Sequence, residues 1–375
     1  PFGNSFRSPR FIFISHKKDY YILNKNNELI LSSDSKLPSM IGHNIGNIYS
    51  RKTNKEDKEL ISKFFDKLTT YIMSYNASSS IRYSVNPFLG KTKFEYDKFE
   101  SIYTLTTNEI RLDKPKDKIW SSSEELTSYR NDWIEHFPQY EDYIQHLLAC
   151  RFSKNRRSSF MYLNFNPAFG KSVLMDILVS LGVATQLSEQ DIKYSSASGI
   201  NTTKLRSAWV LVFDELKGFP AEFKSMINTL SVTAKFKFSE EFDVYQKLLL
   251  SAESNQALMS DSGVDTQLTD RINYITNKDK PVQLSERKLY KQNPEFYYKT
   301  LTQVIFQDLR SGLDRYIAMG QDEANNKASS VLRELHKQYS LEHSTNNVED
   351  EVKQALMNAK EALKNQWKDY INKDY

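Results

Sequence analysis

The chain has 375 residues, and its 51 Lys and Arg residues against 47 Asp and Glu residues leave a formal net charge of only +4. This balance excludes a histone-like or purely electrostatic binder, and a composition that is 39% hydrophobic and 13% aromatic excludes a disordered or low-complexity chain. The single cysteine, Cys150, excludes a disulfide framework within the chain and a four-cysteine zinc site. The length suggests about two or three globular domains.

The apolar runs and the N-terminus bear on where the protein resides. No run approaches the roughly 18–20 apolar residues that span a bilayer, and the N-terminus lacks the layout of a signal peptide. We therefore expect a cytoplasmic protein with no membrane partner. Because the chain begins at Pro1 and not at Met, we also expect it to have been cut out of a longer polypeptide.

The first third of the chain is basic and reads as a small mixed α+β module, residues 1–118. Residues 1–120 hold 20 Lys and Arg against 13 Asp and Glu, a net charge of +7, which leaves −3 for the rest. Two apolar runs at 11–14 and 20–23, around a polar turn, predict a β-hairpin. Further on, lysines such as Lys91 and Lys93 alternate with aromatic residues. This mixture suits a single-stranded nucleic acid, but a solvated surface with ordinary core aromatics is the more common explanation.

Near residue 120 the pattern changes to helix, and residues 119–157 are expected to form a helical collar. Ser121 and Glu124 fit a capping box, with the helix running up to Pro138. A second helix follows, and its apolar residues share one packing face: Tyr140, Tyr143, Ile144, Leu147 and Leu148.

Residues 158–290 alternate short apolar strands with helical stretches, which predicts an α/β domain with a largely parallel sheet. The predicted strands are residues 160–165, 209–213, 247–251 and 272–275. Residues 291–375 are expected to be helical, beginning at Pro294. Apolar residues form two stripes there, both predicted to be packing faces: Leu301, Val304, Ile305, Leu309 and Leu313, and then Val352, Leu356, Ala359, Leu363 and Trp367.

The strongest functional signal lies between the first predicted strand of this domain and the helix after it. This segment has the residues of a phosphate-binding loop: Asn166, Pro167, Ala168, Phe169, Gly170, Lys171 and Ser172. Backbone N–H groups of such a loop surround phosphates, the lysine reaches the β- and γ-oxygens of ATP, and the hydroxyl binds Mg²⁺. Phe165 stands where the usual pattern has glycine. A side chain is tolerated there if the φ values of the loop are negative, and otherwise it alters the loop geometry and with it the rate of ATP hydrolysis.

Polar residues follow the next strands at the edge where ligands of open α/β sheets bind. Asp214 and Glu215 come directly after residues 209–213, where Asp214 can hold Mg²⁺ and Glu215 can activate the attacking water. Asn255 follows the strand 247–251 and is a candidate sensor of the γ-phosphate, a turn-forming Asn being the alternative. Arg271 precedes the last strand and can neutralise charge in a neighbouring subunit's site.

In order and spacing these pieces resemble the superfamily 3 helicases of viruses and phages, a branch of the AAA+ ATPases. Residues 143–148 and 312–317 also look like the flanks of the helicase half of phage primase-helicase and primase-polymerase proteins. The resemblance covers about residues 120–320. It implies a hexameric ring of identical subunits that binds ATP and Mg²⁺ at subunit interfaces, draws in single-stranded DNA, and belongs to a polypeptide that also carries a primase or polymerase.

In that family a hairpin before the sensor strand grips DNA, which here assigns Lys235 and Lys237 to DNA binding. Glu253 departs from the small hydroxyl residue that relatives tend to carry. Two rival functions stay open: a DNA-binding and oligomerisation module whose nucleotide site does not turn over, and a nucleotide kinase or other small-molecule phosphotransferase. Against the second, the sequence shows no arginine-rich lid.

Overall fold

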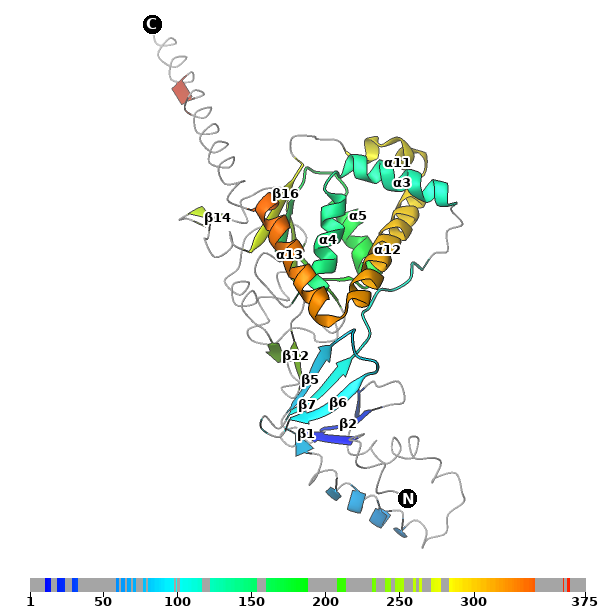
Figure 1. The fold of residues 1–375 in the computed structure, drawn as a ribbon, viewed down its shortest axis with the longest axis vertical. Coiled ribbons are helices and arrows are strands. Elements are labelled where there is room, and N and C mark those ends of the chain that lie inside the picture. The colour runs from blue at the N-terminus through cyan, green and yellow to red at the C-terminus, as the bar shows by residue number, and fades with distance from the viewer. Residues whose placement is uncertain are drawn as a thin grey trace, which may run out of the picture. The chain divides into compact units, whose positions relative to one another are not determined.

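The computed structural model divides the chain into two compact units (Figure 1). The smaller comprises Pro1–Ile110, Tyr194–Arg206 and Thr229–Val244, and the larger comprises Arg111–Lys193, Ser207–Asn228 and Tyr245–Tyr375. The structure describes the following residues: 11–14, 19–23, 29–32, parts of 59–71, most of 77–116, 122–153, 160–187, 208–213, 231–233, 240–243, 247–252, 259–260, 263–264, 271–277, 283–340, and 360 with 363–364.

The smaller unit contains two sheets. The first has the order β3-β2-β1-β4, with β1 Phe11–Ile14, β2 Asp19–Leu23, β3 Leu29–Ser32 and β4 Ala77–Ser78. Strands β1 and β2 pair antiparallel, which confirms the predicted hairpin. The second has the order β11-β12-β5-β7-β6, with β5 Ser80–Val85, β6 Lys93–Asp97, β7 Ile102–Thr107, β11 Ser231–Thr233 and β12 Glu240–Asp243.

A small aromatic core joins these two sheets, because Tyr21, Ile81 and Tyr103 are buried together with Phe94 against them. The rings of Phe94 and Tyr103 stack with centroids 5.1 Å apart. Phe94 is thus held by packing, whereas Lys93 beside it is exposed. The alternation of basic and aromatic residues on β6 is here that of a strand with one solvated face.

The strand pair β11–β12 is a hairpin, as its antiparallel register shows. Strand β12 also pairs in parallel with β5, so this hairpin belongs to the smaller unit although its residues lie, in sequence, within the segment expected to form the ATPase core. Residues 234–239 at its tip, which include Lys235 and Lys237, lie outside the described residues.

The larger unit is built on a fully parallel sheet with the order β16-β8-β13-β10-β9. Its strands are β8 Phe160–Asn164, β9 Ala184–Gln186, β10 Val210–Phe213, β13 Lys247–Ala252 and β16 Ile272–Thr276. Every residue of β8 and β10 is buried, as expected for parallel strands covered on both faces. The predicted α/β class with a parallel sheet is confirmed. A two-stranded pair, β14 Met259–Ser260 and β15 Gly263–Val264, lies apart from this sheet.

Helices accompany the sheet: α3 Ser123–His136, α4 Tyr140–Phe152, α5 Lys171–Ser180, the short 3-10 helix η2 Leu284–Glu286, α11 Lys288–Gln292, α12 Pro294–Met319 and α13 Gln321–Tyr339. The predicted capping box was one residue too early: Ser122 and Glu125 form it, not Ser121 and Glu124. Consecutive serines and glutamates fit both registers, and a local pattern cannot choose between them. Helix α12 begins at Pro294 as predicted.

Helices α4, α12 and α13 pack together, and Figure 1 shows α12 and α13 diverging from their junction around α4. The first apolar stripe of α12 is buried as predicted: Leu301, Val304, Ile305, Leu309 and Leu313. The second prediction is wrong for Leu363, which is 58% exposed, while the other residues of that stripe lie outside the described residues. Helical spacing defines an apolar face but not what covers it. Among the described helices, none combines the length and apolar character needed to cross a membrane.

Candidate functional site

The loop between β8 and α5 has the backbone of an anion-binding site. Ala168 and Gly170 both have left-handed backbone angles, with φ of 61° and 103°, and Gly170 is the N-cap of α5. The turn is closed by the Phe169 N–H, which donates to the Asn166 carbonyl at 3.3 Å. Alternating backbone hands of this kind turn successive N–H groups to one side, and the helix N-terminus adds its own. The loop can therefore hold a phosphate.

Lys171 is the first residue of α5, and its side chain is folded back onto this loop. Its Nζ donates to the Phe165 carbonyl at 3.1 Å, and the residue is only 7% exposed. Burying an ammonium group is costly unless it is hydrogen-bonded, so the loop carbonyl stabilises the lysine here. Ser172 follows it and is exposed. The charged amine and the hydroxyl thus lie at the helix end where a phosphate would bind.

Phe165 does not distort the loop. Among the described non-glycine residues, only Ala168 has a positive φ, so position 165 does not require glycine. The Phe165 ring is fully buried, with centroids 5.3 Å from Phe137 and 4.4 Å from Phe169. The condition under which a side chain is tolerated is therefore met at position 165 itself, and the ring belongs to the core beneath the loop.

Two elements hold the loop from outside. The Leu284 N–H, at the start of η2, donates to the Ala168 carbonyl at 2.9 Å, and a Cβ on Gly170 would lie 2.9 Å from the Leu284 side chain. The His136 ring stacks on Phe169 with centroids 4.3 Å apart, and its Nε2 lies 2.7 Å from the Phe169 carbonyl. Because a carbonyl only accepts, Nε2 carries the proton. Burial lowers the pKa of His136.

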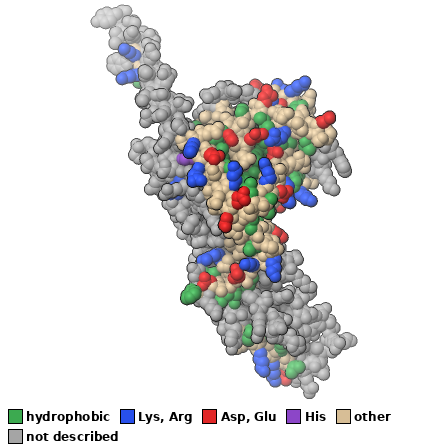
Figure 2. Space-filling view, viewed as in Figure 1, with side chains coloured by type: hydrophobic (Ala, Val, Ile, Leu, Met, Phe, Trp, Pro, Cys, Tyr) green, Lys and Arg blue, Asp and Glu red, His purple; other side chains and the backbone are tan. Residues whose placement is uncertain are grey.

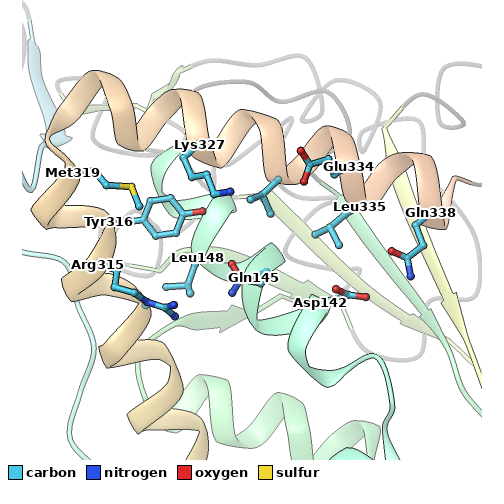
Figure 3. A pocket seen from close by; sticks show the side chains of 12 residues that line it. Asp142, Gln145, Leu148, Arg315, Tyr316, Met319, Lys327, Glu334, Leu335 and Gln338 are labelled. Carbon is cyan, nitrogen blue, oxygen red and sulfur yellow. The ribbon is translucent and has the colours of Figure 1, made fainter.

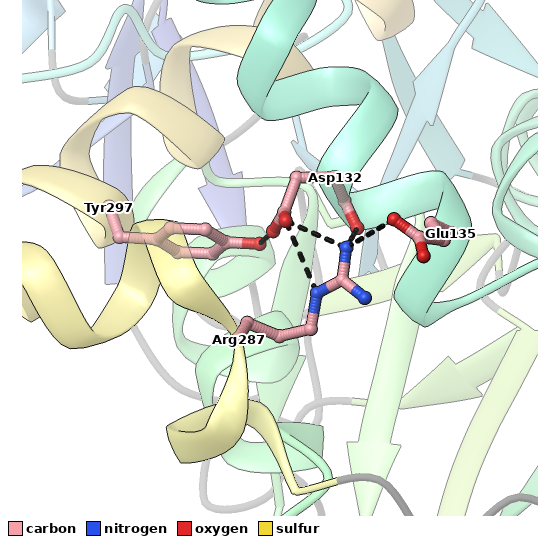
Figure 4. Close-up of polar contacts among 4 residues, drawn as sticks. All are labelled: Asp132, Glu135, Arg287 and Tyr297. Carbon is pink, nitrogen blue, oxygen red and sulfur yellow. Dashed lines mark hydrogen bonds and ion pairs between the residues drawn. The ribbon is translucent and has the colours of Figure 1, made fainter.

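An arginine network ties η2 to α3 and α12 (Figure 4). Arg287 donates to Asp132 Oδ1 from Nε at 3.2 Å and from Nη2 at 2.7 Å, and Nη2 also reaches Glu135 Oε2 at 2.7 Å. The Tyr297 hydroxyl donates to Asp132 Oδ2 at 2.8 Å. The hydrogen bond from Arg287 to Glu135, together with the positive charge of the guanidinium group, lowers the pKa of the Glu135 carboxyl. The network holds α3, and with it His136, against the segment that carries Leu284.

Sequence reasoning missed these supporting residues. Arg287 and Asp132 are 155 positions apart, so no local pattern links them. A further omission is Asn277, directly after β16, whose Oδ1 accepts the Asn166 N–H at 3.1 Å. Asn277 could have been found from the sequence, because it is a polar residue directly after a predicted strand, which is the pattern that identified Asn255 as a candidate.

The strand order places the carboxyl ends of the predicted strands at the same end of the sheet as the loop. Strand β13 lies between β8 and β10, and Asn164, Ala252 and Thr276 share one register level at the ends of three strands. The strand before Asn255 is therefore adjacent to the loop strand, as predicted. Strand β10, which precedes Asp214, lies two strand spacings from β8, or roughly 10 Å. Asp214, Glu215, Glu253 and Asn255 themselves lie outside the described residues.

Arg271 lies at the amino-terminal end of the parallel strands, whereas the loop lies at their carboxyl-terminal end. Its carbonyl accepts the Phe160 N–H at 3.0 Å, at the beginning of β8. Since β16 then runs parallel to β8 over Ile272–Thr276, Arg271 is about 16 Å along the strand from the loop's edge. The chain does not bring Arg271 to its own loop, and its predicted action on a neighbouring subunit stays a prediction.

Charged side chains of both signs share one face of the larger unit. Figure 2 shows Lys and Arg side chains mixed with Asp and Glu over this visible face.

No protein-family model matches the sequence, and no curated protein does either. Among solved structures, two apo structures of the NrS-1 C-terminal region are similar, each with a TM-score of 0.48, at 15% and 13% identity, covering 88% of this chain and 74% of that chain. A third structure of the same region has a TM-score of 0.42 and 14% identity, covering 80% of this chain and 70% of that chain. A likeness at this level indicates neither a shared activity nor a shared ligand.

Proposed function

We propose that the larger unit is an ATP-hydrolysing motor which, as a ring of identical subunits, moves along single-stranded DNA within a replication protein. One observation carries this proposal: a loop with left-handed Ala168 and Gly170, ending in Lys171, stands at the carboxyl edge of a parallel sheet. Loops of this build bind the phosphates of nucleotides. A longer polypeptide carrying a primase or polymerase is part of the same proposal.

Each predicted residue has a role in this proposal. Lys171 would bind the β- and γ-phosphates, and Ser172 with Asp214 would hold Mg²⁺, which stabilises charge that develops on the transferred phosphoryl group. Glu215 would take the proton of the attacking water. The interposed strand β13 supports this division, because the end of β10, which directly precedes Asp214 in the sequence, lies about two strand spacings from the loop strand.

The remaining roles concern neighbouring subunits and DNA. Asn255 would sense the γ-phosphate, and Arg271 would act on the nucleotide of the next subunit. Lys235 and Lys237 would grip the DNA backbone without reading its sequence. The β11–β12 hairpin supports this last role, because its strands flank residues 234–239 on both sides.

ATP hydrolysis with and without single-stranded DNA tests the proposal. We expect Lys171→Ala and Glu215→Gln to abolish turnover, while Lys291→Ala, an exposed lysine on α11, leaves it unchanged. Wild-type protein that hydrolyses no more ATP than Lys171→Ala, with or without DNA, would rule the motor out. A mass measurement with ATP and DNA tests the ring separately.

A non-hydrolysing DNA-binding and oligomerisation module is the second candidate. The observation that favours it is that the Lys171 ammonium group already donates a hydrogen bond to the Phe165 carbonyl and that Lys171 is 7% exposed. This candidate predicts salt-sensitive DNA binding that Glu215→Gln does not alter.

A further inference from the structure

A cavity lies in the larger unit, between α4, α12 and α13 (Figure 3). Its volume is about 460 Å³, within the range that small-molecule sites occupy. None of its lining residues belongs to the phosphate loop or to the residues that contact that loop. The cavity therefore requires an explanation of its own.

One end of this cavity presents hydrogen-bond donors. In Figure 3 the side chains of Arg315, Tyr316 and Lys327 reach into the same space from α12 and α13. Neither Arg315 nor Lys327 forms an ion pair with a carboxylate in the part of the chain that the structure describes. Both side chains are exposed to solvent, and they bring two positive charges to this end of the cavity, which favours an anionic occupant there.

The Tyr316 hydroxyl is an independent sign of a ligand. Tyr316 is 4% exposed, and its hydroxyl has no hydrogen-bond partner among the described residues. Its ring is fixed by stacking on Phe152 with centroids 4.7 Å apart and an angle of 9°. Burial raises the pKa of Tyr316 to about 12, so the hydroxyl remains a donor at neutral pH. A buried donor without an acceptor is costly, and an anion in the cavity would supply one.

The rest of the cavity changes from apolar to acidic. Leu148, Val331 and Leu335 line it and are buried. The carboxylates of Asp142 and Glu334 line the remaining part of the cavity. Asp142 accepts a hydrogen bond from the Tyr339 hydroxyl, and Glu334 accepts one from the Ser330 hydroxyl. Along α13, Lys327 and Glu334 are about 10 Å apart, since each helical residue advances 1.5 Å. A cationic end, an apolar middle and an acceptor end match the parts of a nucleotide in order.

We propose that this cavity binds a nucleoside phosphate, either as a free nucleotide or as one unit of a single DNA strand. Arg315, Lys327 and the Tyr316 hydroxyl bind the phosphate, and the apolar middle holds the base or sugar. The carboxylates of Asp142 and Glu334 accept hydrogen bonds from amino or hydroxyl groups. The site is separate from the phosphate loop and does not rest on ATP hydrolysis there.

Calorimetric titration of the full chain tests this proposal, using AMP, inorganic phosphate and a short oligothymidylate. Titration of the Lys171→Ala variant, alongside the wild-type chain, separates the cavity from the loop. We expect Arg315→Gln to weaken AMP binding about tenfold, the effect of one charge-assisted hydrogen bond. Arg310→Gln is the matched control, because Arg310 is an exposed arginine of the same helix that pairs with Asp314.

Tyr316→Phe separates a ligand-binding role from a structural one. Removing an unpartnered buried hydroxyl is expected to raise the unfolding midpoint of the free protein, while it lowers the affinity for AMP several-fold. Binding of the oligonucleotide but not of AMP would assign the site to DNA. The proposal is overturned if neither binds, if Arg315→Gln and Arg310→Gln behave alike, or if inorganic phosphate binds as tightly as AMP.

Discussion

Restoring the usual glycine at position 165 is expected to damage the protein instead of improving its nucleotide site. The Phe165 ring is fully buried between Phe137 and Phe169. The backbone carbonyl of Phe165 accepts a hydrogen bond from the Lys171 ammonium group. Phe165→Gly removes the ring from the core and loosens the backbone that holds the lysine. Both effects act against an ordered loop.

The magnitude follows from the burial. Truncating a buried Phe to Ala costs about 3–5 kcal/mol, and the step from Ala to Gly adds about 0.5–1 kcal/mol through the greater freedom of the unfolded chain. The total of about 4–6 kcal/mol is a large share of the roughly 5–15 kcal/mol that stabilises a typical domain. With an m-value of roughly 3 kcal/mol per M of urea, the unfolding midpoint falls by about 1.3–2 M.

Urea unfolding monitored by fluorescence, together with ATP binding, measures both effects. Phe165→Leu is the control, because it keeps an apolar side chain and is expected to cost less than about 1.5 kcal/mol. We expect the glycine variant to unfold earlier and to bind ATP more weakly than this control. A glycine variant with the wild-type midpoint and stronger ATP binding would refute the placement of Phe165 in the core.

Three further predictions concern the surrounding helices. Gly312→Ala would place its new Cβ against the Leu148 side chain, and it should destabilise the protein by about 1–2 kcal/mol in thermal unfolding despite the higher helix propensity of alanine. An unchanged melting temperature would contradict this close helix contact. Arg287→Met should cost about 2 kcal/mol in urea unfolding because it strands a largely buried carboxylate, whereas Glu135→Gln, at an exposed partner, should leave the midpoint unchanged; equal losses would contradict the assignment. Burial lowers the folded-state pKa of His136, so the unfolded chain takes up its proton first and stability should fall as the pH drops below about 6.5. His136→Asn should flatten this part of a midpoint-against-pH curve, and an identical slope would exclude His136 as its source.

Local patterns predicted the elements of the larger unit well. The strands around residues 160–164, 210–213, 247–252 and 272–276 were located to within a residue at each end, because buried apolar runs bounded by polar residues are a local property. The Gly-Lys-Ser run at the start of α5 was likewise visible in the sequence, because it is a local pattern, and its binding of phosphate stays a prediction. The exact cap of α3 was not, because neighbouring serines offer two equivalent registers.

Tertiary structure decided what surrounds these elements. Only the strand order shows that β13 separates β8 from β10, and only packing shows that Phe165 fills the core and not the loop. The Arg287 network and the cavity at Tyr316 join residues more than a hundred positions apart or on different helices, and such contacts leave no periodic signal. The sequence by itself determined which segments form strands and helices and which residues form the loop between β8 and α5, because those features depend on near neighbours. Long-range packing determined which side chains contact that loop and which residues line the cavity between α4, α12 and α13.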